Sequence, residues 1–125
     1  MNKFLKNFIY FFLIILAIDV PWIYNVMSKY YKKIFRNNIE IKLNYYLATI
    51  VYIIMTIGYV FFVFNNNNNV NKYYLSFFYG LVLYGTYAFT LAAMFKTFPF
   101  EIALLETIWG GTLFTLSLLI YNLIH

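Results

Sequence analysis

Three acidic side chains lie in or beside long apolar stretches, and they are the groups in this chain best suited to chemistry. They are Asp19, Glu101 and Glu106. Because an ionisable group inside a bilayer is costly, it usually faces a protein interior or a water-filled cavity. Carboxylates held there can bind a ligand or a proton, or they can accept hydrogen bonds that hold helices together.

Two of these acids are each followed by a tryptophan three residues later. Asp19 precedes Trp22, and Glu106 precedes Trp109. Since positions i and i+3 share a helix face, each carboxylate has an indole one turn away, and an indole N–H can donate a hydrogen bond to it. In the first helix the tryptophan lies nearer the membrane face than its acid, and in the last helix it lies deeper. The two elements therefore run in opposite directions, as in an inverted repeat.

Pro21 stands between Asp19 and Trp22. Proline cannot donate a backbone hydrogen bond, and its ring disturbs the preceding helical turn. One interpretation is a kink that frees the Ala17 carbonyl near Asp19. The other is that Pro21 marks an early end of the first helix, with Trp22 and Tyr24 as anchors at the membrane interface.

Glu101 differs from the other two acids because it follows Pro99 in the first turn of the last helix. A proline at a helix start followed by an acid suits the positive end of the helix dipole. We therefore interpret Glu101 as a structural residue.

Long apolar stretches must position these residues, and the composition identifies them as membrane segments. Of the 125 residues, 64% are hydrophobic and 10% are charged, whereas a soluble domain is about half apolar and about a quarter charged. A spanning helix needs about 20 apolar residues, and four such stretches cover residues 4–26, 45–64, 73–94 and 100–122. We predict an all-α integral membrane protein, a single four-transmembrane-helix bundle with short loops over residues 1–125.

The apolar stretches are expected to be uncleaved helices. They do not alternate polar and apolar residues, as the strands of a closed barrel would. The first stretch runs into Asp19-Val20-Pro21-Trp22 rather than into the small residues of a signal-peptide cleavage site.

Small residues four positions apart predict close approach between helices of the bundle. On the third helix they are Ser76 and Gly80, then Ala88 and Ala92, and on the last helix the adjacent Gly110 and Gly111 leave room for a close neighbour.

Counting along the helices places polar groups of all four in one layer. Asp19 lies seven residues before the predicted end of the first helix and Glu106 six residues after the start of the last, so both are about 10 Å below the same membrane face. We predict that the two carboxylates point inward at similar depth. The candidate ligand- or proton-binding residues are Asp19, Trp22, Tyr52, Thr86, Tyr87, Thr90, Glu106 and Trp109.

The connections between the helices differ in charge and predict an orientation. Residues 27–44 form a basic loop with five of the nine lysines and arginines, residues 65–72 a polar turn, and residues 95–99 a tight turn containing Lys96. The first and third connections together carry six positive charges against three on the opposite side. Because positive charge favours the cytoplasm, both termini are predicted to be non-cytoplasmic.

The basic loop at residues 27–44 also predicts a partner besides the bilayer itself. Its cationic side chains are interleaved with Tyr30, Tyr31, Ile34 and Phe35, which suits anionic lipid headgroups. The alternative is that these charges only set topology. Nucleic acid is not a predicted partner, because the charges flank membrane segments and form no extended stripe.

Cysteine chemistry is excluded, since the chain contains no cysteine, and its single histidine is His125. The sequence also shows no phosphate-binding loop and no nucleophile triad. We predict no metal and no cofactor.

Taken in order, these motifs resemble an uncharacterised family of small predicted membrane proteins, the domain of unknown function 2177. The resemblance covers nearly the whole chain. It implies a small membrane protein and no particular reaction. It rests on Asp19-Val20-Pro21-Trp22, the stretch "YGTYAFT" at residues 84–90, Pro99 in the turn, and Glu106-Thr107-Ile108-Trp109-Gly110.

Three positions depart from the family pattern. The third helix of the family typically reads T-Y-D-L-T-N, but Ala88 stands at the acid position and Leu91 at the asparagine position. The acid of the last helix is usually aspartate and here is Glu106. The chain therefore lacks two polar residues of the family pattern, and no activity is inferred for it from the family.

Three classes of function fit these residues. The favoured hypothesis is a structural or ligand-binding helical bundle, in which Trp, Tyr and Thr donors satisfy Asp19 and Glu106. The alternative is an oligomeric ion- or proton-coupled transporter or channel that uses the same two acids, with a homo-oligomer needed because four short helices rarely enclose a pathway. A third and least favoured class is an enzyme that acts on lipid-like substrates with the paired carboxylates as acid and base.

Overall fold

A computed structural model describes residues 2–34, 44–66 and 69–124 of the chain. In these ranges the elements are α-helices or π-helical turns, and no strand occurs. The elements are α1 (Lys3–Trp22), η1 (Ile23–Met27), α2 (Ser28–Ile34), α3 (Tyr45–Gly58), η2 (Tyr59–Phe64), α4 (Lys72–Met94) and α5 (Phe100–Ile124).

The described residues contain four helical segments that are long and apolar enough to cross a membrane. These segments are Lys3–Tyr30, Tyr45–Phe64, Lys72–Met94 and Phe100–Ile124. Each contains or nearly coincides with one of the apolar stretches seen in the sequence. The predicted fold class, an all-α membrane protein with a four-helix bundle, is therefore confirmed.

The first helical run continues beyond Pro21, so an early helix end at this proline was the wrong interpretation. Pro21 lies inside α1, and the chain passes through the π-helical turn η1 into α2. The amide of Ile23 donates to the carbonyls of both Asp19 and Val20, which keeps the turn after the proline closed. A π-helical turn next to proline lets the helix absorb the missing hydrogen bond without stopping.

The basic segment predicted as a loop is helical in its first part. Residues 27–34 belong to η1 and α2 rather than to a loop, and the side chains of Lys29 and Lys32 are exposed. The remainder of the predicted loop, with Arg36, Glu40 and Lys42, lies in residues 35–43, outside the described residues.

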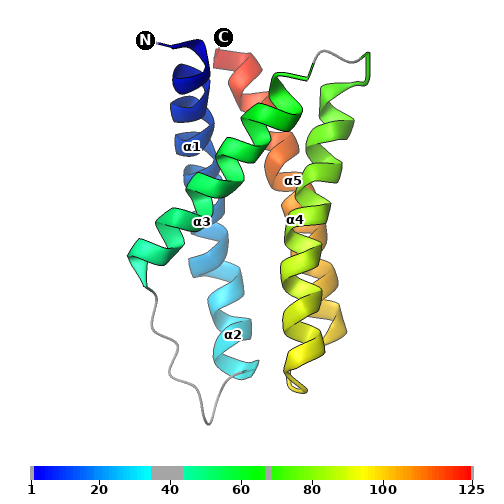
Figure 1. Cartoon of the computed structure of the whole chain (residues 1–125). Helices are drawn as coiled ribbons and strands as arrows, with labels where there is room; N and C mark the ends of the chain where they lie inside the picture. The colour runs from blue at the N-terminus through cyan, green and yellow to red at the C-terminus, as the bar shows by residue number, and fades with distance from the viewer. Residues whose placement is uncertain (1, 35–43, 67–68, 125) are drawn as a thin grey trace.

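The helices form a bundle in which α3 crosses obliquely and α4 and α5 lie side by side (Figure 1). Both ends of the chain lie at the same end of the bundle, and α2 and the turn between α4 and α5 lie at the opposite end (Figure 1). The start of α3 projects away from α4, whereas η2 packs against α4. Four spans connected in this way return the chain to the side where it began.

Glycines allow the backbones of α4 and α5 to touch. A Cβ atom at Gly80 would lie 1.9 Å from the carbonyl oxygen of Gly110, and one at Gly110 would lie 2.5 Å from the Gly80 oxygen. A side chain at either position would therefore push the helices apart. This confirms the close approach predicted from the small residues, and it sets how α4 and α5 face the rest of the bundle.

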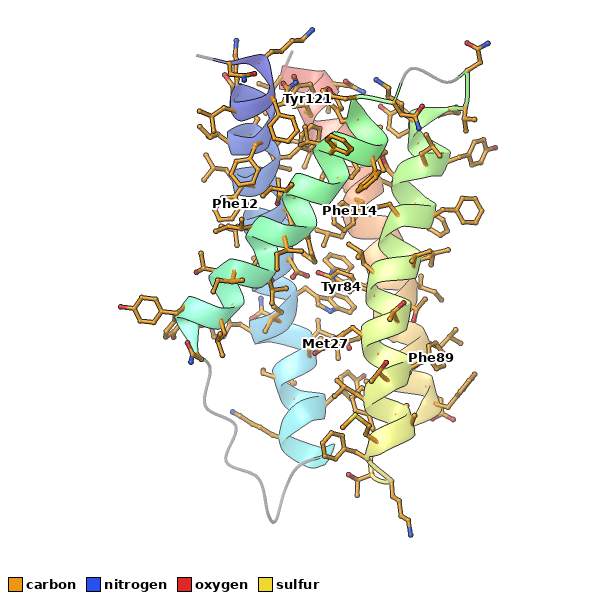
Figure 2. All side chains as sticks on the ribbon, viewed as in Figure 1. Phe12, Met27, Tyr84, Phe89, Phe114 and Tyr121 are labelled. Atoms are coloured by element: carbon orange, nitrogen blue, oxygen red, sulfur yellow. The ribbon has the colours of Figure 1, made fainter. Side chains whose placement is uncertain are left out.

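Two groups of buried side chains hold the bundle together. The larger group is rich in aromatic rings and includes Phe11, Tyr59 and Phe114, with the partly buried Tyr121 packed against it (Figure 2). The smaller group lies toward α2 and contains Met27, Ala88, Phe98, Ile102 and Ala103. The buried polar residues described next lie along the same helix faces.

Candidate functional site

Asp19 lies on the buried stripe of α1. Asn7, Phe11, Ile15 and Asp19 follow one another at intervals of four residues, and all four are buried. Only 3% of Asp19 is exposed. The helical repeat thus directs the carboxylate toward the interior of the bundle rather than toward lipid.

Three donors from the three other spans surround the Asp19 carboxylate. The Tyr52 hydroxyl of α3 donates to Oδ2. The Tyr84 hydroxyl of α4 donates to the same oxygen at 3.1 Å, and the Trp109 indole Nε1 of α5 donates to Oδ1 at 2.8 Å. We call these four residues the Asp19 cage. Through it, one side chain of α1 is hydrogen-bonded to every other span of the bundle.

The two tryptophans of the repeated pattern stack on each other. The ring centroids of Trp22 and Trp109 are 4.2 Å apart, and their planes differ by 5°. The Trp109 N–H donates to Asp19, across helices, rather than to the acid of its own element. The buried Trp22 Nε1 has no hydrogen-bond partner among the residues that the structure describes. Trp22 therefore packs on a member of the cage, but only Trp109 donates to Asp19.

Glu106 is also buried, with 5% of its surface exposed. It lies on the inner face of α5, four residues after Ile102 and four before Gly110, both of which are buried. Trp109 lies one turn farther along the same helix and reaches Asp19. The acids of the two acid-x-x-tryptophan elements are thus both inside the bundle, and Glu106 lies one helical turn from a donor to Asp19.

Asp19 is deeper than the sequence suggested. The estimate of about 10 Å assumed a first helix that ends near Val26. The apolar helical span continues to Tyr30, eleven residues beyond Asp19. At 1.5 Å per residue, Asp19 lies about 16 Å from that end, near the middle of its span.

Three candidate residues of α4 lie outside the cage. Thr86, Tyr87 and Thr90 are exposed, Tyr87 to 50%. The two threonine hydroxyls donate to carbonyls four residues earlier in α4. Together with Val82, Leu83 and Leu91, these residues line a shallow groove of about 340 Å³ on the outer face of the helix.

Tyr84 is the residue of α4 that completes the layer, and it was missed in the sequence. The sequence offered one signal for it. Tyr84 falls in the same four-residue series as the small residues Ser76, Gly80 and Ala88, which are all buried. That series marks the inner face of α4, and a tyrosine on it must point into the bundle.

Further hydrogen bonds tie the spans on the side of the termini. The Tyr59 and Ser76 hydroxyls are 2.7 Å apart, and the Tyr79 hydroxyl donates to the Met55 carbonyl at 2.8 Å. Nearer the termini, the Tyr121 hydroxyl donates to Asn7 Oδ1 at 2.7 Å. Glu101, by contrast, is exposed in the first turn of α5.

The chemistry available to the Asp19 cage is acceptance of hydrogen bonds by one carboxylate. Among the described residues, no group of three His, Cys, Asp or Glu side chains comes together in a way that could hold a metal ion. The donors to Asp19 are phenols and an indole. They can hold the carboxylate in place by hydrogen bonding.

Comparison with known proteins gives one family. The family described as "Predicted membrane protein (DUF2177)" matches residues 4–121, nearly the whole chain. Neither the curated proteins nor the solved structures give a match. The description of the family places it in the membrane and names no reaction.

Proposed function

Because the chain belongs to the DUF2177 family of predicted membrane proteins, we propose that it is a structural helical bundle of the membrane, tied together by the Asp19 cage. The observation that carries this proposal is that Asp19 accepts hydrogen bonds from α3, α4 and α5 at once. Both carboxylate oxygens have at least one donor. A polar group satisfied in this way can hold helices together in a medium that offers no water.

The proposed role explains why an acid lies near the middle of an apolar span. An unsatisfied carboxylate there would cost several kcal/mol, whereas a caged one links four helices that hydrophobic burial alone does not hold together in lipid. Trp22 stacks on Trp109, one of the three donors to the carboxylate. Asp19 thus serves the assembly of the bundle and does not need an external ligand.

Ion- or proton-coupled transport by an oligomer is the second candidate function. The observation in its favour is that Asp19 and Glu106 are both buried, because acids inside a membrane bundle are typical of proton relays. In the structural proposal, the three donors hold Asp19 permanently. In the transport alternative, the Asp19 carboxylate must leave these donors and return to them during each transport cycle.

The two functions are separated by the variants Asp19→Asn and Glu106→Gln. If the role is structural, the parent protein in liposomes carries no proton flux, and Asp19→Asn lowers the free energy of unfolding in mild detergent. A proton flux in the parent that both variants abolish, with unchanged unfolding, would overturn the structural proposal and establish transport.

We also propose that both termini face the non-cytoplasmic side. The common position of the two chain ends supports one shared side for them (Figure 1), and the six positive charges of the first and third connections support the cytoplasm as the opposite side. The chain has no cysteine, so single cysteines report topology directly. In intact cells, an impermeant maleimide should label Asn69→Cys and should not label Thr97→Cys; the opposite result reverses the orientation.

Contact of the basic segment with anionic lipid is a further part of the proposed function. Lys29 and Lys32 are exposed at the end of the bundle opposite the termini. Cations at this position suit the acidic headgroups of a cytoplasmic leaflet. Binding to vesicles of defined charge, compared between the parent and the Lys29→Gln/Lys32→Gln variant, tests this contact.

A further inference from the structure

A hollow lies at the end of the bundle that carries the termini. It has a volume of about 580 Å³ and lies between the start of α1, the end of η2, the start of α4 and the end of α5. We call it the terminal pocket. It is lined by Lys3, Phe4, Asn7, Phe64, Asn65, Lys72 and Tyr121.

Two ammonium groups give the terminal pocket a positive charge, and no acid of the described residues lies beside them. Lys3 and Lys72 both line it, and neither forms an ion pair among the described residues. Asp19 lies sixteen residues along α1 from Lys3, about 24 Å at 1.5 Å per residue. Glu106 lies fifteen residues along α5 from Tyr121, about 22 Å. At such distances neither acid can form an ion pair with the lysines.

The lining of the terminal pocket is partly fixed before any ligand arrives. The Lys72 ammonium lies 4.9 Å from the centroid of the Phe64 ring, which holds the cation by its attraction to the ring face. Asn7 is 4% exposed and accepts a hydrogen bond from the Tyr121 hydroxyl through Oδ1. This bond uses the acceptor atom of the amide and leaves its NH₂ group as the donor end.

The position of the terminal pocket matches the depth of a lipid headgroup. Its residues come from the first two turns of α1, the first turn of α4, the last turn of η2 with the following Asn65, and the last turn of α5. These are the ends of four apolar spans, where the hydrocarbon core meets the headgroup region. The rings of Phe4, Phe64 and Tyr121 form apolar lining beside the two cations.

We propose that the terminal pocket binds a phosphate-bearing anion, with Lys3 and Lys72 as the cationic ligands. Two ammonium groups with amide donors beside them suit the oxygens of a phosphate group. The apolar part of the lining suits the glycerol and first methylenes of a phospholipid, but a soluble phosphate offers the same charged group. This site is at the opposite end of the bundle from Lys29 and Lys32.

The test is binding to the full chain, purified in an uncharged detergent and followed by native mass spectrometry. Phosphatidylglycerol is titrated against phosphatidylcholine with the same acyl chains, and inorganic phosphate is titrated separately and as a competitor. We expect tighter binding of phosphatidylglycerol or measurable binding of phosphate. Each of Lys3→Gln and Lys72→Gln should weaken it about five-fold, and the double variant should weaken it about twenty-five-fold.

Matched variants give the control. Lys6→Gln removes an exposed charge of the same helix that does not line the pocket and should change the affinity less than two-fold. Lys72→Arg keeps the positive charge that Lys72→Gln removes, so it should bind like the parent. Equal helical content and thermal stability show that the neutral variants are folded, since all these side chains are exposed.

The outcomes distinguish the source of the phosphate. Lysine-dependent binding of phosphatidylglycerol that phosphate does not displace supports a lipid headgroup, and displacement by phosphate supports a soluble ligand. The proposal is overturned if phosphatidylglycerol binds no better than phosphatidylcholine and phosphate does not bind. It is also overturned if the double variant binds like the parent, or if only Lys29→Gln/Lys32→Gln loses binding.

Discussion

The two acid-x-x-tryptophan elements have identical spacing and different surroundings. Asp19 of the first element is held by three donors from three helices. Trp109 of the second element supplies one of these donors, while the buried Trp22 N–H has no partner among the described residues. The productive pair is therefore the acid of one element with the tryptophan of the other. The sequence spacing indicates that both elements lie in one layer of the bundle. Which acid meets which tryptophan depends on the antiparallel packing of α1 and α5.

The largest effect is expected when the acid of this pair is removed. In Asp19→Leu, two hydroxyls and an indole N–H lose their acceptor inside the bundle, so we expect the free energy of unfolding to fall by about 3 kcal/mol. Asp19→Asn keeps one acceptor oxygen and should lose less. The measurement is reversible unfolding by SDS in mixed micelles. Glu101→Leu removes an exposed acid that only meets the dipole of the first turn of α5 and serves as the control, with an expected loss under about 1 kcal/mol.

The next effect concerns the helix contact that brings Trp109 and Tyr84 to the acid. In Gly80→Ala, the new methyl group meets the Gly110 carbonyl, with a Cβ to oxygen distance of 1.9 Å before any shift. The backbones must separate, and we expect a loss of about 2 kcal/mol.

The matched control for this substitution lies on the same helix. In Gly85→Ala, the nearest atom is the Thr107 Cγ2 at 3.2 Å, the end of a side chain that can yield. The same unfolding measurement should show a smaller loss. Equal losses for the two variants would show that backbone contact between α4 and α5 does not set the geometry of the cage.

A direct comparison of the two tryptophans gives the third effect. Trp109→Phe removes the donor to Asp19 Oδ1, whereas Trp22→Phe removes an N–H without a described partner and keeps an aromatic ring. We expect a loss of about 1.5 kcal/mol for Trp109→Phe and under about 1 kcal/mol for Trp22→Phe. The reverse order, measured by unfolding in micelles, would contradict the cross-helix pairing.

The smallest effects belong to the two phenols. Tyr52→Phe and Tyr84→Phe each remove one hydroxyl donor from Asp19 Oδ2 while keeping the ring, so each should cost about 0.6 kcal/mol. Tyr74→Phe on the exposed face of α4 is the control and should be neutral within error. If Tyr74→Phe costs as much as Tyr84→Phe, the hydroxyl bond to Asp19 contributes nothing specific.

The number of spans could be predicted from the sequence, because the bilayer fixes how many apolar residues each helix needs. The rotation of each helix about its axis could not be predicted in the same way. Each residue turns the helix by about 100°, and a helix that is apolar all round gives no amphipathic signal of its inner face. Depth counting therefore selected Tyr87, which is half exposed, instead of Tyr84.

The local breaks in the first helical run were also beyond sequence reasoning. Pro21 usually ends a helix or kinks it, but here a π-helical turn follows and the helix continues to Ile34. The lysines that follow were interpreted as a loop because of their charge, although Lys29 and Lys32 belong to α2. Charge indicates exposure to water, and it does not exclude a helix that extends out of the apolar region.

The central claim is that the carboxylate of Asp19 and the indole of Trp109 stabilise the bundle together. A double-mutant cycle with Asp19→Leu, Trp109→Phe and the double variant measures their coupling in the free energy of unfolding. Because the indole N–H donates to Oδ1 at 2.8 Å, we predict a coupling of about 1 kcal/mol, so that the double variant loses less than the sum of the single losses. Additive losses, with a coupling within about 0.3 kcal/mol of zero, would contradict the account.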